Sequence, residues 1–160
     1  MKKTPQQQKG FGIIEVIVCI AIIMITFWSF TGIAKYCLKI QEQNRVKIEA
    51  VNLASEAIEV VRSIRNENWD NISSLLLETK YYPIISENEW TLTLSNPGVI
   101  NGTYNRSITL ERVYRDTSDN ISKSGIEDNQ TMKIIALVEW NDRGQTKQIN
   151  LSTYLTNWNN

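Results

Sequence analysis

A long apolar segment near the N-terminus carries a single charged residue. Phe11 to Ala34 comprises 24 residues, of which Glu15 alone is charged. As an α-helix this segment would be about 36 Å long, which is enough to cross a bilayer. A carboxylate in the hydrocarbon costs roughly 2.5–3.5 kcal/mol. The segment therefore predicts a membrane-spanning helix whose one acid lies at the interface or beside a positive partner.

Positive charge is concentrated before this segment. Lys2, Lys3 and Lys9 are three of the 17 basic residues, which balance 17 acidic ones in the whole chain. Because basic flanks stay in the cytoplasm, they predict a cytoplasmic N-terminus and a C-terminal domain on the other side. An ordinary secretory signal, with an apolar region of about 7–15 residues and a small-x-small cleavage site, does not fit. Without the first ten residues, 14 basic residues face 17 acidic ones, which argues against a nucleic acid as partner.

Several residue types that catalysis and metal binding require are missing. The chain has no histidine, which excludes Ser-His-Asp and Cys-His chemistry and histidine-ligated metals. It also shows no Gly-rich phosphate loop. Cys19 and Cys37 would lie about 27 Å apart on one helix and cannot form a disulfide with each other. We therefore expect no enzyme, no cofactor and no metal site.

The residues around the start of the apolar segment resemble a known processing signal. The stretch KGFGIIEVIVCIAII, residues 9–23, is similar to the class III signal of type IV pilins, pseudopilins and related prepilins. The resemblance comprises the short basic leader, the Gly-Phe junction, the glutamate five residues after the glycine, and the apolar run behind it. Gly12 departs from the pattern, since many members have threonine there.

This resemblance implies roles for three residues. A prepilin peptidase would cleave between Gly10 and Phe11, and Phe11 would become an N-methylated N-terminus. In a filament of packed helices, Glu15 would pair with the α-amino group of Phe11 on a neighbouring subunit. Residues 1–10 would block that approach, so cleavage would have to precede assembly.

Behind the apolar segment, the pattern predicts an amphipathic helix. No proline or glycine occurs between Lys35 and Arg65, and apolar residues recur there at spacings of three and four. They are Val46, Ala50, Leu53, Ala57, Val60, Val61 and Ile64. Charged residues on the opposite face are expected to be solvated. They are Lys47, Glu49, Glu56, Glu59 and Arg62. The helix would run from about Phe11 to Arg65, with Gly32 as its most flexible point.

The C-terminal part of the chain predicts an antiparallel sheet. Alternating apolar residues indicate strands at Glu89–Ser95 and Tyr104–Arg115, the second with a bulge or an end near residues 111–112. Met132–Trp140 and Lys147–Leu155 form a predicted hairpin whose turn ends at Gly144, in the left-handed conformation. Met132–Trp140 is partly apolar on both faces, which is typical of a central strand.

Two polar connections complete this part. Asn66–Tyr82 is expected to link helix and sheet, with a short helical turn at residues 75–77. Asp116–Gln130 is predicted to be the longest loop and an exposed functional surface. It contains possible calcium ligands, but their spacing matches no EF-hand and a solvated acidic loop is favoured. They are Asp116, Asp119, Glu127 and Asp128.

Four tryptophans and two tyrosines are expected to pack in the core or at its edge. They are Trp69, Trp90, Trp140, Trp158, Tyr81 and Tyr82.

These patterns together predict an α+β, pilin-like fold, in which a long N-terminal helix packs against an antiparallel sheet. The expected parts are a leader peptide (1–10), a transmembrane and filament-core helix (11–34), an amphipathic helix (35–65) and an extracytoplasmic β-sheet domain (66–160). The chain would lie in the cytoplasmic membrane as a single-pass protein and later in an extracellular or periplasmic filament.

Two further stretches are similar to minor pilins, which initiate, cap or decorate filaments. They are AVNLASEAIEVVRSIR at residues 50–65 and LVEWNDRGQTKQINLSTYLTNW at residues 137–158. The resemblance implies prepilin peptidase and other pilin subunits as partners. Two alternatives stay open: a minor pseudopilin of a type II secretion or DNA-uptake system, and an unprocessed membrane-anchored binding domain.

Overall fold

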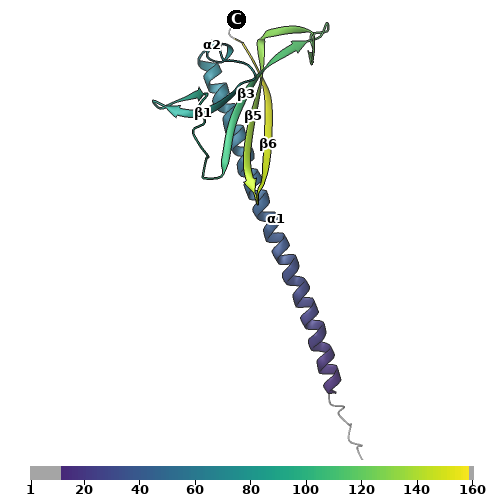
Figure 1. Cartoon of the computed structure of the whole chain (residues 1–160). Coiled ribbons are helices and arrows are strands. Elements are labelled where there is room, and N and C mark those ends of the chain that lie inside the picture. The colour runs from purple at the N-terminus through teal and green to yellow at the C-terminus, as the bar shows by residue number, and fades with distance from the viewer. Residues whose placement is uncertain (1–11, 159–160) are drawn as a thin grey trace, which may run out of the picture. The chain divides into compact units, whose positions relative to one another are not determined.

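The computed structural model describes residues 12–158, which form two helices and six strands (Figure 1). The elements are α1 (Ile13–Glu67), α2 (Asp70–Ser73), β1 (Lys80–Ser86), β2 (Glu89–Thr93), β3 (Tyr104–Arg115), β4 (Ile121–Ser122), β5 (Ile126–Asp142) and β6 (Gln145–Thr156). The chain divides into a first compact unit up to Arg45 and a second from Val46 onward, and α1 contributes to both. The predicted α+β class is confirmed.

The first unit consists of the N-terminal part of α1. This helix begins at Ile13 and continues without a break through Gly32, where the sequence predicted its most flexible point. Its expected first residue, Phe11, lies outside the described residues. The apolar side chains of this part are exposed in the isolated chain, among them Ile13 and Trp28.

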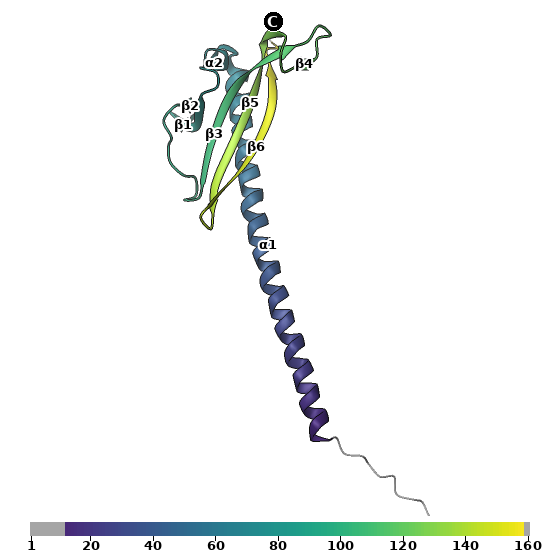
Figure 2. The same ribbon diagram turned by 45° about the vertical axis from the view of Figure 1, so that its right-hand side comes forward.

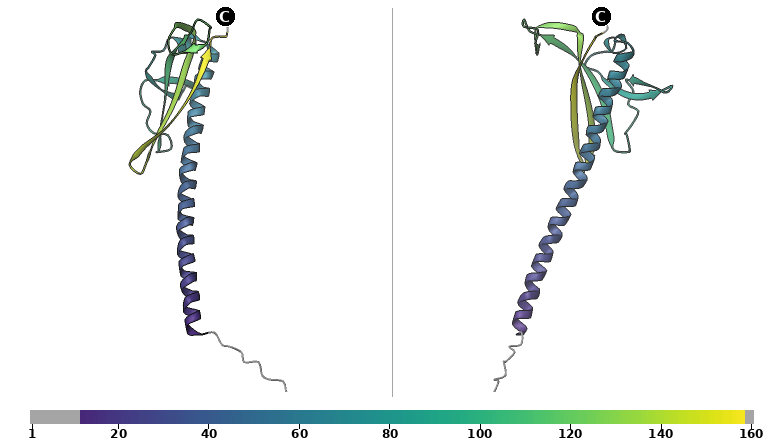
Figure 3. Two further views of the ribbon diagram at one scale, coloured as in Figure 1. Left: turned by 90° about the vertical axis from the view of Figure 1, so that its right-hand side faces the viewer. Right: turned by 180° about the vertical axis from the view of Figure 1, so that it is seen from behind.

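The second unit is a sheet packed on the C-terminal part of α1. The strand order is β2-β1-β3-β5-β6, with β4 paired to β3 (Figure 2), and all pairs are antiparallel. The sheet lies on one side of the helix (Figure 3). Since β5 pairs with β3 on one side and β6 on the other, its predicted central position is confirmed.

The core of the second unit lies between helix and sheet. Ala50, Ala54 and Ala57 are fully buried, and their small side chains allow the strands to approach the helix closely. Ile134 and Val138 of β5 are also fully buried, and each contributes about 1.5–3 kcal/mol by leaving water. The predicted apolar stripe therefore faces the core, although Val46 and Leu53 are only partly buried.

The strand predictions are largely confirmed. β3 has the predicted bounds, and its register with β5 shifts between Arg112 and Tyr114, close to the expected bulge. The β5–β6 hairpin is longer than predicted at both ends. Its two-residue turn places Arg143 at φ 54° and Gly144 at φ 83°, as a type I′ turn requires. The N–H of Gly144 donates to Asn141 Oδ1 at 2.8 Å.

The predicted connection Asn66–Tyr82 is wrong in two respects. Strand β1 begins within it, at Lys80. The sequence hides this strand because Pro83, which cannot donate a ladder hydrogen bond, interrupts its pattern. The predicted helical turn at residues 75–77 is also wrong, because the short helix α2 lies earlier and its Ile72 is fully buried in the core.

The predicted loop Asp116–Gln130 is confirmed only in part: it is largely exposed, but strands occupy residues 121–122 and 126–130. β3 and β5 remain paired at Tyr114↔Glu127 and Arg115↔Ile126, and β4 pairs with the other edge of β3. We call residues 113–130 the polar arm. Gly125 has φ 146°, and a Cβ there would lie 2.1 Å from the carbonyl oxygen of Arg115. The arm therefore combines paired strands with exposed turns, and it requires glycine at position 125.

Two acids of the helix face that was predicted to be solvated contact the sheet. Glu56 Oε1 lies 3.2 Å from Nη1 of Arg106, whose side chain is only 6% exposed. The same Nη1 donates to the carbonyl oxygen of Leu53 at 3.4 Å. Glu49 accepts hydrogen bonds from the Tyr104 hydroxyl and the Asn101 side chain. These contacts attach β3 to α1.

The aromatic residues have different environments. Tyr81 is buried, and Trp69, Trp90 and Trp140 pack partly buried against the core. Trp158 is 69% exposed, so its predicted role in packing is limited to one contact. The Arg65 guanidinium lies 4.9 Å from its ring centre, and Arg65 Nη1 donates to the carbonyl oxygen of Thr156 at 2.8 Å. This contact holds the end of β6 against α1.

We expect the substitution Arg106→Ala to lower the free energy of unfolding by about 2–4 kcal/mol, because it removes buried packing and the pair with Glu56. Urea unfolding of the full chain in detergent, followed by tryptophan fluorescence, measures the effect. Arg62→Ala is the matched control. Arg62 pairs with Glu59 at 2.6 Å, but the two side chains are 41% and 62% exposed, so the expected loss is about 0.5 kcal/mol or less. Equal losses would contradict the anchoring role of Arg106.

Candidate functional site

The part of α1 from Ile13 to Ala34 is the first candidate site, and we call it the assembly segment. Among the described residues, α1 is the one helix that is long and apolar enough to cross a membrane, with a mean hydropathy of 2.5 over its most apolar window. No residue of that window is buried within the chain. An apolar surface of this extent requires lipid or other protein chains as its surroundings.

The hydroxyl groups of the assembly segment are satisfied by its own backbone. Thr26 donates to the carbonyl oxygen of Ile23 at 2.8 Å, and Ser29 to that of Ile25 at 3.0 Å. Thr31 donates to the carbonyl oxygen of Trp28 at 2.8 Å. These bonds suit an apolar environment, where an unsatisfied polar group is costly.

Glu15 differs from these residues, since its carboxylate forms no ion pair with any residue between 12 and 158. It lies in the first turn of α1, where the helix dipole favours a negative charge. Its backbone N–H donates to the carbonyl oxygen of Gly12 at 2.9 Å. Gly10 and Phe11, the other predicted residues of this site, lie outside the described residues. The structure thus presents one acid that needs a partner at the start of an apolar helix.

The polar arm is the second candidate site. Its four acids face basic residues or backbone donors and are not gathered around one point. Asp128 accepts from Arg115 Nε at 2.7 Å, and Arg112 pairs with Glu127 at 2.8 Å. Asp119 lies 3.6 Å from Arg115, and Asp116 accepts from the N–H groups of Ser118 and Asn120. No group of three or more His, Cys, Asp or Glu side chains in residues 12–158 is arranged to hold a metal.

These contacts change the acidity of the arm. The hydrogen bond from Arg115 lowers the pKa of Asp128 and raises the pKa of Arg115 itself. The backbone N–H groups of Asn120 and Ser118 lower the pKa of Asp116. Both acids are therefore held in their charged form, and their charge stabilises the arm.

The sequence reasoning missed the ion pairs of the arm. A weak signal for them exists: two arginines, Arg112 and Arg115, precede Gly125, and two acids, Glu127 and Asp128, follow it. Opposite charges on either side of a Gly-containing turn are compatible with paired strands. The pairs between α1 and β3 have no comparable signal, because their residues are about 50 positions apart in the sequence.

Comparison with known families identifies the N-terminal region. Residues 5–29 match the family described as the prokaryotic N-terminal methylation motif. The match includes Gly10, Phe11, Glu15 and most of the assembly segment. Neither a search of curated proteins nor a search of solved structures found a match. The chain thus carries the class III signal of type IV pilins, which supports a pilin- or pseudopilin-like precursor and points to a structural subunit.

Acidification is expected to loosen the polar arm before the core. Asp116 and Asp128 have lowered pKa values in the folded arm, so their charged forms stabilise it at pH values above the ordinary Asp pKa of about 3.9. This stabilisation is lost as the pH falls through the pKa values of the folded state. NMR of the chain in detergent micelles, titrated from pH 6 downward, would show residues 113–130 changing before Ile134. Asp116→Asn keeps the acceptor oxygen without the charge and should reduce the change. If the NMR signals of the arm and of the core changed at the same pH, the expected earlier loosening of the arm would be contradicted.

Proposed function

We propose that the chain is a minor pilin-like structural subunit that is made as a membrane-anchored precursor and assembled into a filament through its N-terminal helix. The observation that carries this proposal is the assembly segment, which is exposed and internally satisfied apart from Glu15. The match to the N-terminal methylation motif supports it independently. In the precursor, Lys2, Lys3 and Lys9 stay in the cytoplasm and the second unit lies outside.

Processing creates the partner that Glu15 lacks. A prepilin peptidase cleaves between Gly10 and Phe11, and the free, N-methylated amino group of Phe11 carries a positive charge. In the filament this group pairs with Glu15 of a neighbouring subunit. A buried carboxylate is tolerated only when it is paired, so the pair selects one register of the two helices. Other pilin subunits and the peptidase are therefore the partners of this segment.

The second unit is the part that the filament exposes. The resemblance of residues 50–65 and 137–158 to minor pilins supports a role in initiating, capping or decorating the filament. A pseudopilin of a secretion or DNA-uptake apparatus would use the same helix and the same pair of charges. An anchored binding domain that is never processed would use the helix as an anchor only and would not form the pair of charges.

The substitution Glu15→Val tests the assembly role. We expect normal membrane insertion, because valine suits the hydrocarbon, but at least about a tenfold loss of the chain from sheared filaments, because the Phe11 amino group is left unpaired. Immunoblots of membranes and filaments measure both. Cys19→Val, in the same segment, is the control and should be incorporated normally. Undiminished incorporation of Glu15→Val would exclude the proposed pair.

A further inference from the structure

A cleft lies in the second unit where α1 ends. It has a volume of about 530 Å³ and is formed by the last turn of α1, by α2 and by β2. Trp90 and Leu92 form part of its wall, and Glu67, Asp70 and Glu89 supply three carboxylates. None of these carboxylates has an ion-pair partner in the described part of the chain. The cleft therefore combines an apolar wall with uncompensated negative charge.

The opposite end of the second unit carries a basic projection. The β5–β6 hairpin extends past β3, which begins opposite Trp140, by the further pairs Asn141↔Thr146 and Asp142↔Gln145. We call this end of the hairpin, residues 141–147, the basic tip, because Arg143 and Lys147 outnumber Asp142 in it. Neither of the two basic side chains pairs with an acid among the residues that the structure describes. The type I′ turn gives the tip a defined conformation.

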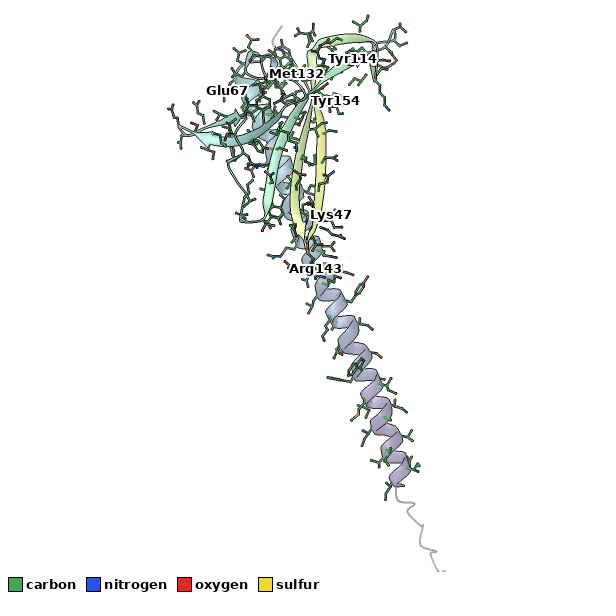
Figure 4. The ribbon with its side chains drawn as sticks, in the orientation of Figure 1. Lys47, Glu67, Tyr114, Met132, Arg143 and Tyr154 are labelled. Carbon is green, nitrogen blue, oxygen red and sulfur yellow. The ribbon has the colours of Figure 1, made fainter. Side chains whose placement is uncertain are left out.

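The two surfaces lie at opposite ends of one axis. Figure 4 shows Lys47 and Arg143 at one end of the second unit and Glu67 at the other. Lys47 and Glu67 are 20 residues apart on α1, which corresponds to about 30 Å along the helix. Copies that stand parallel and are shifted along this axis would therefore bring the tip of one to the cleft of the next.

We propose that the cleft binds the basic tip of a second copy of this chain. Arg143 would enter between the carboxylates, with its aliphatic stem against Trp90 and Leu92. The occupant follows from charge complementarity, because one chain carries both surfaces and neither has an ion-pair partner among residues 12–158. Such a head-to-tail contact does not close on itself, so it adds copies in a row. The inference rests on the proposed function, which supplies the parallel orientation of the copies.

Disulfide trapping tests this contact in filaments that incorporate the full chain. Two tagged copies are expressed together, both with Cys19→Ala and Cys37→Ser; one carries Gln145→Cys in the tip and the other Thr91→Cys in the cleft. Mild oxidation should join the two tags. Adding Arg143→Glu to the first copy should lower the yield roughly tenfold, because like charges would meet. Adding Glu67→Lys to the second copy as well should restore most of the yield of joined product.

The control is Lys123→Glu, which makes the same charge change in the polar arm and should leave the yield unchanged. If both copies are found in filaments but no product joins the tags, the head-to-tail contact is excluded while the proposed function stands. The contact is also excluded if Arg143→Glu has no effect. If neither copy is incorporated into filaments, the proposed function and the inference fail together.

Discussion

The constraint on which this structure depends is the lone carboxylate of Glu15 on an exposed apolar helix. The hydroxyl groups of Thr26, Ser29 and Thr31 are satisfied by the backbone of α1, whereas Glu15 has no positive partner in residues 12–158. Because a charge in an apolar environment costs several kcal/mol without a partner, the segment is not self-sufficient. Its physical chemistry requires a membrane interface or a positively charged partner beside Glu15, and the N-terminal methylation motif matched there supports a membrane-anchored precursor.

The second unit meets a different requirement, because the continuation of the same helix must be covered on one face. Three fully buried alanines bring the sheet close, and Arg106 and Tyr104 reach from β3 to acids on the side of the helix. The resulting unit keeps its own core. Part of the charge that forms no ion pair inside this unit lies at its two ends, in the acidic cleft and the basic tip, and we propose that these two surfaces join neighbouring copies.

The sequence predicts local features well and contacts between distant residues poorly. The apolar run around Glu15, the period of the stripe through Ala50 and Ala57, and the turn at Gly144 each depend on neighbours in the sequence, so they could be read directly. β1 was missed because Pro83 disturbs its pattern, and the polar arm was missed because ion pairs such as Arg115–Asp128, not apolar residues, hold its strands. The link between Glu56 and Arg106 depends on the tertiary fold alone. Of the candidate site, the structure places Glu15 in the first turn of α1, whereas its role in assembly and its pairing with Phe11 stay predictions.

The measurement that tests this account most directly is the intact mass and N-terminal sequence of the chain recovered from its native membrane. The account predicts a chain that begins at Phe11 and is heavier by one methyl group than the unmodified fragment, because only a free amino terminus at Phe11 supplies the partner for Glu15. A chain that still begins at Met1 would contradict the account, since the nitrogen of Phe11 would then be an uncharged amide that cannot pair with Glu15.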